Sequence, residues 1–513
     1  MKRVALVLSL LLVSVSFSLA QEPPKEKAKE PEVPEAKSSV TSHQITVGGE
    51  SVSYEATAGY LIVNDSKEKP VAKFGYTAYV RDGFDDKSKR PITFAFNGGP
   101  GSASIWLHMG VLGPKIVITP DAEFAPPPPY DVRDNEYSII DVTDLVMIDP
   151  VGTGYSRPVG EGKGADFWGV DQDIDSVSRF IKAYVTENSR WSSPKILLGE
   201  SYGGMRSGGV SLELLESHGM ALNGVVLVSP FMEMATGFDG LGVDLPHVMF
   251  LPTLAATAWY HDALDQRPES LEAFMEEVKA FSYDEFAPAL LKGSRLGEAE
   301  RTAVLAKLSR YTGVSEDYWD RANLRARHGQ FVKELLRERK QTVGRIDSRY
   351  AGRSFNLLGE SMNYDPQSAA VSAAFTSAFL DYYHNDLEFG RDLEYNVSGG
   401  IWGQWDWAHR APGVGFPLPF PNTSIDLAYA MGKNPHMKLL VQQGYYDLAT
   451  PHLATEYYIE HMDLLPAQRE NITFEYYEAG HMMYLHPPSL VKYKDDLARF
   501  ILAATGSPAS LSQ

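Results

Sequence analysis

Six short apolar runs, each ending in a turn, constrain the fold of this chain more than any other feature of its sequence. They are PITFAF (91–96), DLVMIDP (144–150), KILL (195–198), GVVLVSP (224–230), HMKLLVQQG (436–444) and ITFEYYEAG (472–480). Nearly continuous Val, Ile, Leu and Phe, rather than strict alternation with polar residues, is typical of strands that are buried on both faces. Helical stretches between the runs, such as residues 171–187, complete strand-helix-strand units. The sequence therefore predicts an α/β fold with a mostly parallel central sheet.

The first 40 residues have a different character. Residues 1–20 combine Lys2 and Arg3, an apolar run and a small residue at Ala20, which is the pattern of a secretory signal peptide. Residues 21–40 are rich in Pro, Glu and Lys and are predicted to be a disordered tether. We expect an exported protein, periplasmic or extracellular, and no later run is long enough for a membrane span.

Charge and cysteine content exclude several kinds of partner. The 513-residue chain carries a formal net charge of −19 and so lacks the basic surplus that binds nucleic acid. It contains no cysteine, which excludes disulfides and thiolate metal ligands. No H-E-x-x-H motif occurs either. We expect no metal and no cofactor.

The predicted sheet is interrupted by one long segment. Residues 41–230 are predicted to form the first part of the core, and residues 422–513 the second. Residues 231–421 are charged, amphipathic and mostly helical in composition, which predicts a cap inserted between two core strands. An independent helical domain is the alternative, but the core needs strands from both sides. Near the start, residues 43–63 alternate and predict short strands joined at Gly48-Gly49 and near Gly59.

The third apolar run leads directly into the pattern G-x-S-x-G at Gly199–Gly203. A serine at such a strand-to-helix turn is a candidate nucleophile that needs a base and an orienting acid, in the chain order Ser, acid, His. Ser201, Asp447 and His481 follow that order, and the last two come just after predicted strands. Each residue alone has a plain alternative as a turn serine, a capping aspartate or a non-catalytic histidine, but the combination favours catalysis.

Charge that develops during acyl transfer needs preorganised donors. The backbone N–H of Tyr202, next to the nucleophile, is one candidate. The glycine-rich loop 97–101, Asn-Gly-Gly-Pro-Gly, is the candidate for the second, because its glycines allow close backbone approach to a ligand. A plain turn is the alternative for this loop.

Four motifs in order resemble the serine carboxypeptidase family. They are NGGPGSAS (97–104), IDPVGTGYSRP (148–158), GESYGG (199–204) and AGHMMY (479–484), with Asp447 before the last. The resemblance covers residues 90–490 and implies an α/β-hydrolase fold with a helical cap. It also implies hydrolysis of the C-terminal bond of peptides with a free C-terminus, without a cofactor.

Further roles follow from the resemblance by position. Gly99 and Tyr202 would donate the oxyanion-hole N–H groups. Asn97, the Gly98 N–H and Glu200 would hold the terminal carboxylate of the substrate. A carboxyl group binds a carboxylate only while one of the two is protonated, so Glu200 needs a raised pKa, and peptide binding should weaken as pH rises. A structural glutamate bonded to nearby backbone is the alternative.

The chain departs from the family pattern at three positions. Val111 stands where the family commonly has a second glutamate, Ser102 where many members have cysteine, and Tyr484 where proline usually follows Gly-His-Met. The first departure weakens the expectation of terminal-carboxylate recognition more than that of triad chemistry. An esterase or acyltransferase on the same scaffold, and a binding protein with a silent site, therefore remain as alternatives.

Other properties stay open at this level. The cluster Trp402, Trp405 and Trp407 fits either the wall of a substrate cleft or core packing. Side-chain specificity and oligomeric state do not follow from one sequence.

Overall fold

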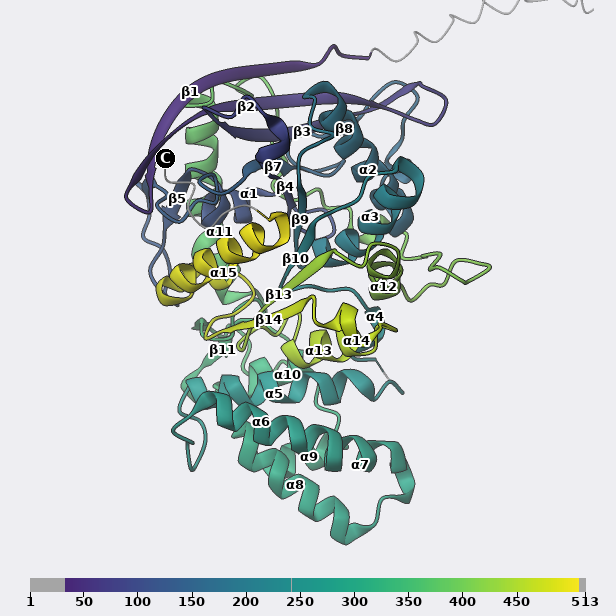
Figure 1. Cartoon of the computed structure of the whole chain (residues 1–513). Helices are drawn as coiled ribbons and strands as arrows, with labels where there is room; N and C mark the ends of the chain where they lie inside the picture. Colours follow the sequence, from purple (N-terminus) through teal and green to yellow (C-terminus); the bar gives the residue numbers. More distant parts are fainter. Residues whose placement is uncertain (1–32, 241, 507–513) are drawn as a thin grey trace, which may run out of the picture.

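The computed structural model describes residues 33–240 and 242–506. The predicted signal peptide and most of the predicted tether lie outside these residues. The described part contains a ten-stranded central sheet in the order β1-β2-β3-β7-β4-β9-β10-β13-β14, with β8 (Arg157–Pro158) beside β3. Figure 1 shows this sheet as the centre of the molecule, with helices on both sides.

All six apolar runs form strands, and these strands make the parallel half of the sheet. They are β4 (Ile92–Phe96), β7 (Asp144–Ile148), β9 (Lys195–Glu200), β10 (Gly224–Val228), β13 (Lys438–Gly444) and β14 (Ile472–Tyr477). The first five are buried along almost their whole length, as predicted. β14 is only half-buried, because it is the last strand of the sheet and has a neighbour on one side only.

The antiparallel half comes from the N-terminal part: β1 (Lys37–Val47), β2 (Glu50–Asn64) and β3 (Pro70–Arg81). β1 and β2 form a hairpin with its turn at Gly48-Gly49, as predicted. The predicted break near Gly59 is wrong: β2 continues through it, and Gly59 gives room for β1, since a Cβ there would lie 2.5 Å from the carbonyl oxygen of Lys37. β1 also begins inside the predicted tether, because residues 37–40 pair with the far end of β2.

Two apolar cores fill the faces of the sheet. One lies under α2 (Val170–Glu187), α3 (Tyr202–His218) and α12 (Ser424–Lys433). The other lies under α11 (Pro366–Asn385) and α15 (Pro487–Thr505), beside α1 (Ile105–Leu107) and the small hairpin of β5 (Lys115–Ile118) and β6 (Asp131–Asp134). This three-layer arrangement is the α/β architecture that the sequence predicts.

The inserted segment forms a helical body at one end of the sheet, seen at the bottom of Figure 1. Its elements are α4 (Met234–Gly237), α5 (Leu245–Tyr260), α6 (Leu271–Phe281), α7 (Ala287–Lys292), α8 (Glu298–Thr312), α9 (Glu316–Arg321), α10 (His328–Glu334), β11 (Gln341–Val343) and β12 (Ala351–Arg353). This body has its own apolar core, which reaches Tyr446 and Leu448 in the loop after β13. The helical body therefore packs directly on a loop that carries a predicted site residue.

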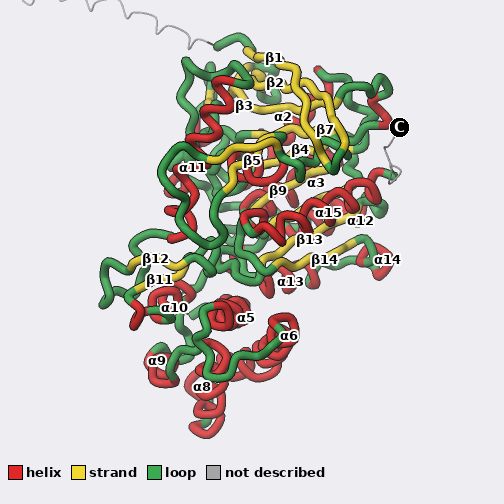
Figure 2. The backbone as a smooth tube through the Cα atoms, turned by 90° about the vertical axis from the view of Figure 1, so that its left-hand side faces the viewer, coloured by secondary structure: helices red, strands yellow, loops and turns green. Residues whose placement is uncertain are grey.

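The segment differs from the predicted cap in one respect. From α11 onward the chain has returned to the sheet: α11 covers the sheet face beside β5, as Figure 2 also shows, and residues 396–398 pair with the loops at Gly154 and Ser102. The composition of residues 368–390 predicts a helix but not the surface that it covers. α13 (His452–Glu460) and α14 (Pro466–Arg469) connect the last two strands. Within residues 33–240 and 242–506, no helix combines the length and apolar character that crossing a membrane requires.

Candidate active site

Ser201 lies at the sharp turn between β9 and α3, as the sequence predicts. Its backbone has φ 62° and ψ −127°, a strained conformation for a residue other than glycine. The turn requires glycine at position 199, since a Cβ there would lie 2.2 Å from the carbonyl oxygen of Gly203. The strain and the close packing fix Ser201 at the end of its strand.

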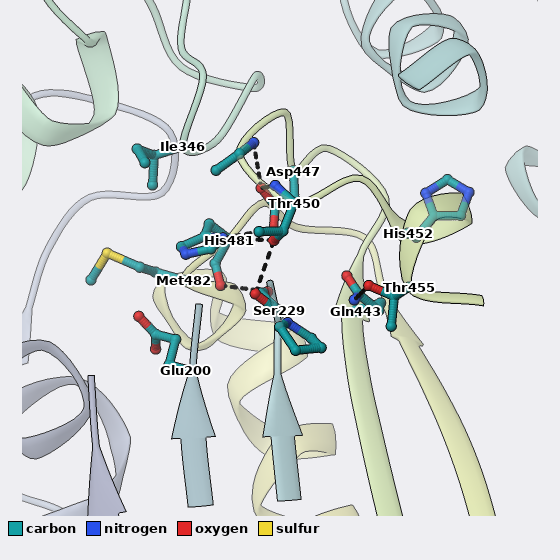
Figure 3. A network of polar contacts seen from close by, with 12 residues as sticks. Glu200, Ser229, Ile346, Gln443, Asp447, Thr450, His452, Thr455, His481 and Met482 are labelled. Atoms are coloured by element: carbon teal, nitrogen blue, oxygen red, sulfur yellow. Dashed lines mark hydrogen bonds and ion pairs between the residues drawn. The ribbon is translucent and has the colours of Figure 1, made fainter. Parts of the chain in front are cut away.

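Asp447 and His481 lie in the loops that follow β13 and β14, and Figure 3 shows their side chains in contact. His481 Nδ1 lies 2.7 Å from Asp447 Oδ2. The carboxylate of Asp447 is fully buried and also accepts bonds from the backbone N–H groups of Ala449 (2.8 Å) and Thr450 (3.0 Å). These bonds orient Asp447 toward His481 before any ligand binds.

The backbone of His481 is fixed on both sides. Its N–H donates to Ile346 O at 2.8 Å, and its carbonyl accepts from Ser229 Oγ at 2.9 Å. Burial alone would lower the pKa of His481, but the charges of Asp447 and Glu200 outweigh burial and raise it. An imidazole held this way, with one nitrogen committed to a carboxylate, suits a general base.

Gly98, Gly99 and Tyr202 line one cavity, and their backbone N–H groups have no protein acceptor among the described residues. The loop after β4 approaches the start of α3 so closely that a Cβ on Gly98 would lie 2.4 Å from Tyr202 N. Arg206 of α3 holds this loop by donating from Nη1 to Asn97 O at 2.8 Å. Free N–H groups after a strand and at the start of a helix can donate hydrogen bonds to an oxygen on which negative charge develops.

Glu200 is buried beside Ser201 and accepts two hydrogen bonds, one on each oxygen. Asn97 Nδ2 donates to Oε1 at 2.7 Å, and the Tyr484 hydroxyl donates to Oε2 at 2.8 Å. Asn97 is itself fixed, because its Oδ1 accepts from Leu107 N at 3.0 Å. Burial is the main cause that raises the pKa of Glu200 to about 7, and the two hydrogen bonds oppose it.

Tyr484 is the contact that the sequence analysis missed. It was identified only as a departure from the family pattern, yet it is fully buried against Glu200. Its ring occupies the space beside Gly110, where a Cβ would come within 2.4 Å of it. Val111, at the position of the missing second glutamate, is fully buried and does not line the cavity.

A cavity of about 710 Å³ brings the predicted residues together. Its walls include Asn97, Gly98, Gly99, Glu200, Ser201, Tyr202 and His481. Asp447 lies behind His481 instead of in the wall. Within the described part of the chain, no hydrogen bond joins Ser201 Oγ to His481. Such a bond often forms only when substrate is present.

Further walls of the cavity come from the inserted segment, including Arg345, Gln367 and Trp402. No motif in the sequence pointed to the first two. The tryptophan cluster has both of the roles that the sequence left open: Trp402 is half-exposed in the cavity wall, whereas Trp405 is buried with its ring edge-on to Tyr202. Within residues 33–240 and 242–506, no group of three or more His, Asp or Glu side chains is arranged to hold a metal ion.

Comparisons with known proteins find similar solved structures and a matching family. The solved structure of Kex1, a prohormone-processing carboxypeptidase from Saccharomyces cerevisiae, matches with a TM-score of 0.53 at 16% identity, over 87% of this chain and 91% of that chain. A proline iminopeptidase from Mycobacterium smegmatis gives a TM-score of 0.37 at 15% identity, over 87% and 99%. Among curated proteins, none matches this chain.

The fold is the α/β-hydrolase fold, a mostly parallel sheet with helices on both faces. The family model described as "Serine carboxypeptidase" matches residues 47–481, which is most of the chain. This chain belongs to the serine carboxypeptidase family.

Proposed function

We propose that this chain hydrolyses the C-terminal peptide bond of its substrates, with Ser201 as nucleophile, His481 as base and Asp447 as the acid that orients it. One observation carries the proposal: the strained Ser201 and the Asp447–His481 pair meet at one cavity, beside three backbone N–H groups that have no acceptor among the described residues. This arrangement fits acyl transfer better than a binding role, which would not need a preoriented imidazole.

In this mechanism, Nε2 of His481 removes the proton of Ser201 as Oγ attacks the last peptide carbonyl. The N–H groups of Gly99 and Tyr202 stabilise the oxyanion that forms. His481 then protonates the leaving amine, and the C–N bond breaks to give an acyl-enzyme. The same histidine next deprotonates a water molecule, which releases the shortened peptide and restores Ser201.

Recognition of the terminal carboxylate rests on Asn97, the N–H of Gly98 and Glu200. The hydrogen bond from Asn97 to Glu200 supports this assignment, since it places an amide and a carboxyl group together beside the nucleophile. Glu200 binds the substrate in its protonated form, because two ionised carboxylates at hydrogen-bond distance repel each other.

Labelling with a fluorophosphonate probe tests the proposal. We expect stoichiometric labelling of Ser201 and loss of both labelling and peptide hydrolysis in Ser201→Ala. Absence of labelling in the folded wild-type protein would favour a silent binding protein. Labelling together with ester hydrolysis, but without peptide hydrolysis, would favour an esterase or acyltransferase.

We also propose that the protein is exported, on the sequence of residues 1–20. N-terminal sequencing of the protein from its native host should then find Gln21 as the first residue. Retention of Met1 or Lys2 would contradict export by this route.

A further inference from the structure

The charged side chains that line the cavity differ in whether they have a partner. His481 contacts Asp447, Glu200 accepts from Asn97 and Tyr484, and Asp239 lies 2.9 Å from Nδ1 of His328. Arg345 also lines the cavity, yet its guanidinium has no hydrogen bond or ion pair to any described residue. The cavity therefore contains one cation whose charge the surrounding protein does not neutralise.

The backbone at Arg345 is held firmly, unlike its guanidinium. The N–H groups of Arg345 and Ile346 donate to Asp365 Oδ2 at 2.6 and 3.1 Å, and Arg345 O accepts from Leu448 N at 3.0 Å. The next carbonyl, Ile346 O, accepts from the N–H of His481. Arg345 is therefore the chain neighbour of Ile346, whose carbonyl directly contacts the proposed base.

Two carboxylates near the backbone of Arg345 already have partners. Asp365 caps α11 through the N–H of Ser368 and binds the two backbone N–H groups just described. Asp347 is bound by Arg349, whose Nη2 lies 2.6 Å from Oδ2, and Arg349 also reaches Asp121. Two arginines four residues apart are therefore used differently: Arg349 is neutralised within the fold, whereas Arg345 faces the cavity.

We propose that Arg345 binds a carboxylate of the substrate in this cavity. A guanidinium presents a planar fork of donors that matches a carboxylate, and such charge-assisted bonds are about twice as strong as neutral ones. This inference depends on the proposed function, which identifies the ligand as a peptide. The carboxylate has two possible sources, an acidic side chain of the substrate or its C-terminus.

The test measures binding instead of turnover, so that it does not depend on catalysis. Isothermal titration calorimetry in a Ser201→Ala background compares three N-blocked dipeptides: Phe-Glu, Phe-Gln and Phe-Gln amide. The variants are Arg345→Gln, which removes the charge, and Arg345→Lys, which keeps the charge without the fork. Arg353→Gln is the matched control, since Arg353 lies in the same segment but is exposed on β12 and stacks on Phe355.

We expect Arg345→Gln to weaken binding about tenfold to a hundredfold for ligands that carry the recognised carboxylate, as the loss of a charged hydrogen bond implies. Loss confined to Phe-Glu identifies an acidic side chain as the source, and equal loss for Phe-Glu and Phe-Gln identifies the C-terminus. Arg345→Lys should recover part of the affinity, and Arg353→Gln should match the parent.

Equal affinities of the parent and Arg345→Gln for all three ligands would overturn the inference. Failure of the proposed function is recognised separately, as absence of peptide hydrolysis by the wild-type protein while these binding differences persist.

Discussion

Glu200 is the residue whose protonation is expected to make peptide binding depend on pH. The buried carboxyl group lies one residue before Ser201, and burial raises its pKa to about 7. In the proposed binding mode, the protonated form donates to the carboxylate of the substrate, whereas the ionised form repels it. Binding of peptides with a free C-terminus should therefore be strong below that pKa and should be lost as pH rises through it.

A KM profile from about pH 5 to about pH 9 tests this expectation. KM of the wild type for a blocked dipeptide should rise about tenfold for each pH unit above the pKa of Glu200, as the protonated fraction falls. Glu200→Gln keeps a donor at every pH, so its KM should not vary with pH. A peptide amide, which lacks the terminal carboxylate, is the control. A flat wild-type profile would remove Glu200 from carboxylate recognition.

Tyr484 supplies a second test at this scale, since its hydroxyl donates to Glu200. Hydrogen bonds to charged groups are worth about 1.5–3 kcal/mol, and this one favours the ionised form of Glu200. Tyr484→Phe should therefore move the rise in KM about one to two pH units upward. The matched control is Tyr493→Phe, because the Tyr493 hydroxyl is buried nearby without a partner among the described residues. Equal profiles for the two variants would show that Tyr484 only fills space.

The sequence predicted these residues unequally, for a physical reason. The places of Ser201, Asp447 and His481 after strands could be predicted because a catalytic triad on such a sheet has fixed residue types and a fixed chain order. The contacts of Tyr484 and Arg345 could not, because no sequence pattern links their positions to a role. Their roles depend on the neighbours that folding gives them, Glu200 for one and the cavity for the other.

Among the elements, the strands with unbroken apolar runs were predicted best. Strands with a neighbour on both sides and helices on both faces, such as β9 and β10, were evident from unbroken apolar runs. The first two strands were harder, since their sequences mix polar and apolar residues. The early start of β1 lies in a polar stretch, and Gly59 inside β2 reads as a turn although the strand continues through it.

His409 joins three elements around the site. Its Nδ1 lies 2.6 Å from Asp171 of α2, and its Nε2 lies 2.9 Å from Asp426 of α12. Burial would lower the pKa of His409, but the two carboxylates outweigh burial and raise it to about 9. The imidazolium therefore links α2 and α12 to the segment that follows Trp405 and Trp407. The rings of these two tryptophans pack edge-on against Tyr202.

Because this pKa is raised on folding, the stabilisation by His409 is complete below about pH 6.5, the unfolded value, and is lost as pH rises through about 9. At about pH 6, His409→Gln should lower Tm by about 2–4 °C, and the difference should disappear near pH 10. His436→Gln, at an exposed histidine, should leave Tm unchanged. A Tm difference that is the same at both pH values would contradict a role for the charge.

At the scale of the whole molecule, the α/β class followed from the alternation of buried strands and helices. The path of the insertion did not. Its first helices form a body with a core of its own, whereas α11 returns to the sheet and adds residues to the cavity wall. An amphipathic pattern shows that a helix has a buried face, but not which surface covers it. The cavity is thus built jointly by the sheet loops and the insertion.

We propose above all that the side chains in this cavity remove amino acids from the free C-terminus of a peptide. The most direct measurement incubates the wild-type protein with one peptide in two forms, with a free and with an amidated C-terminus, and follows the products by mass spectrometry. We predict stepwise loss of residues from the C-terminus of the free form, at a rate at least about tenfold above that of the amidated form. Equal rates for the two forms, or cleavage at internal bonds, would contradict the account.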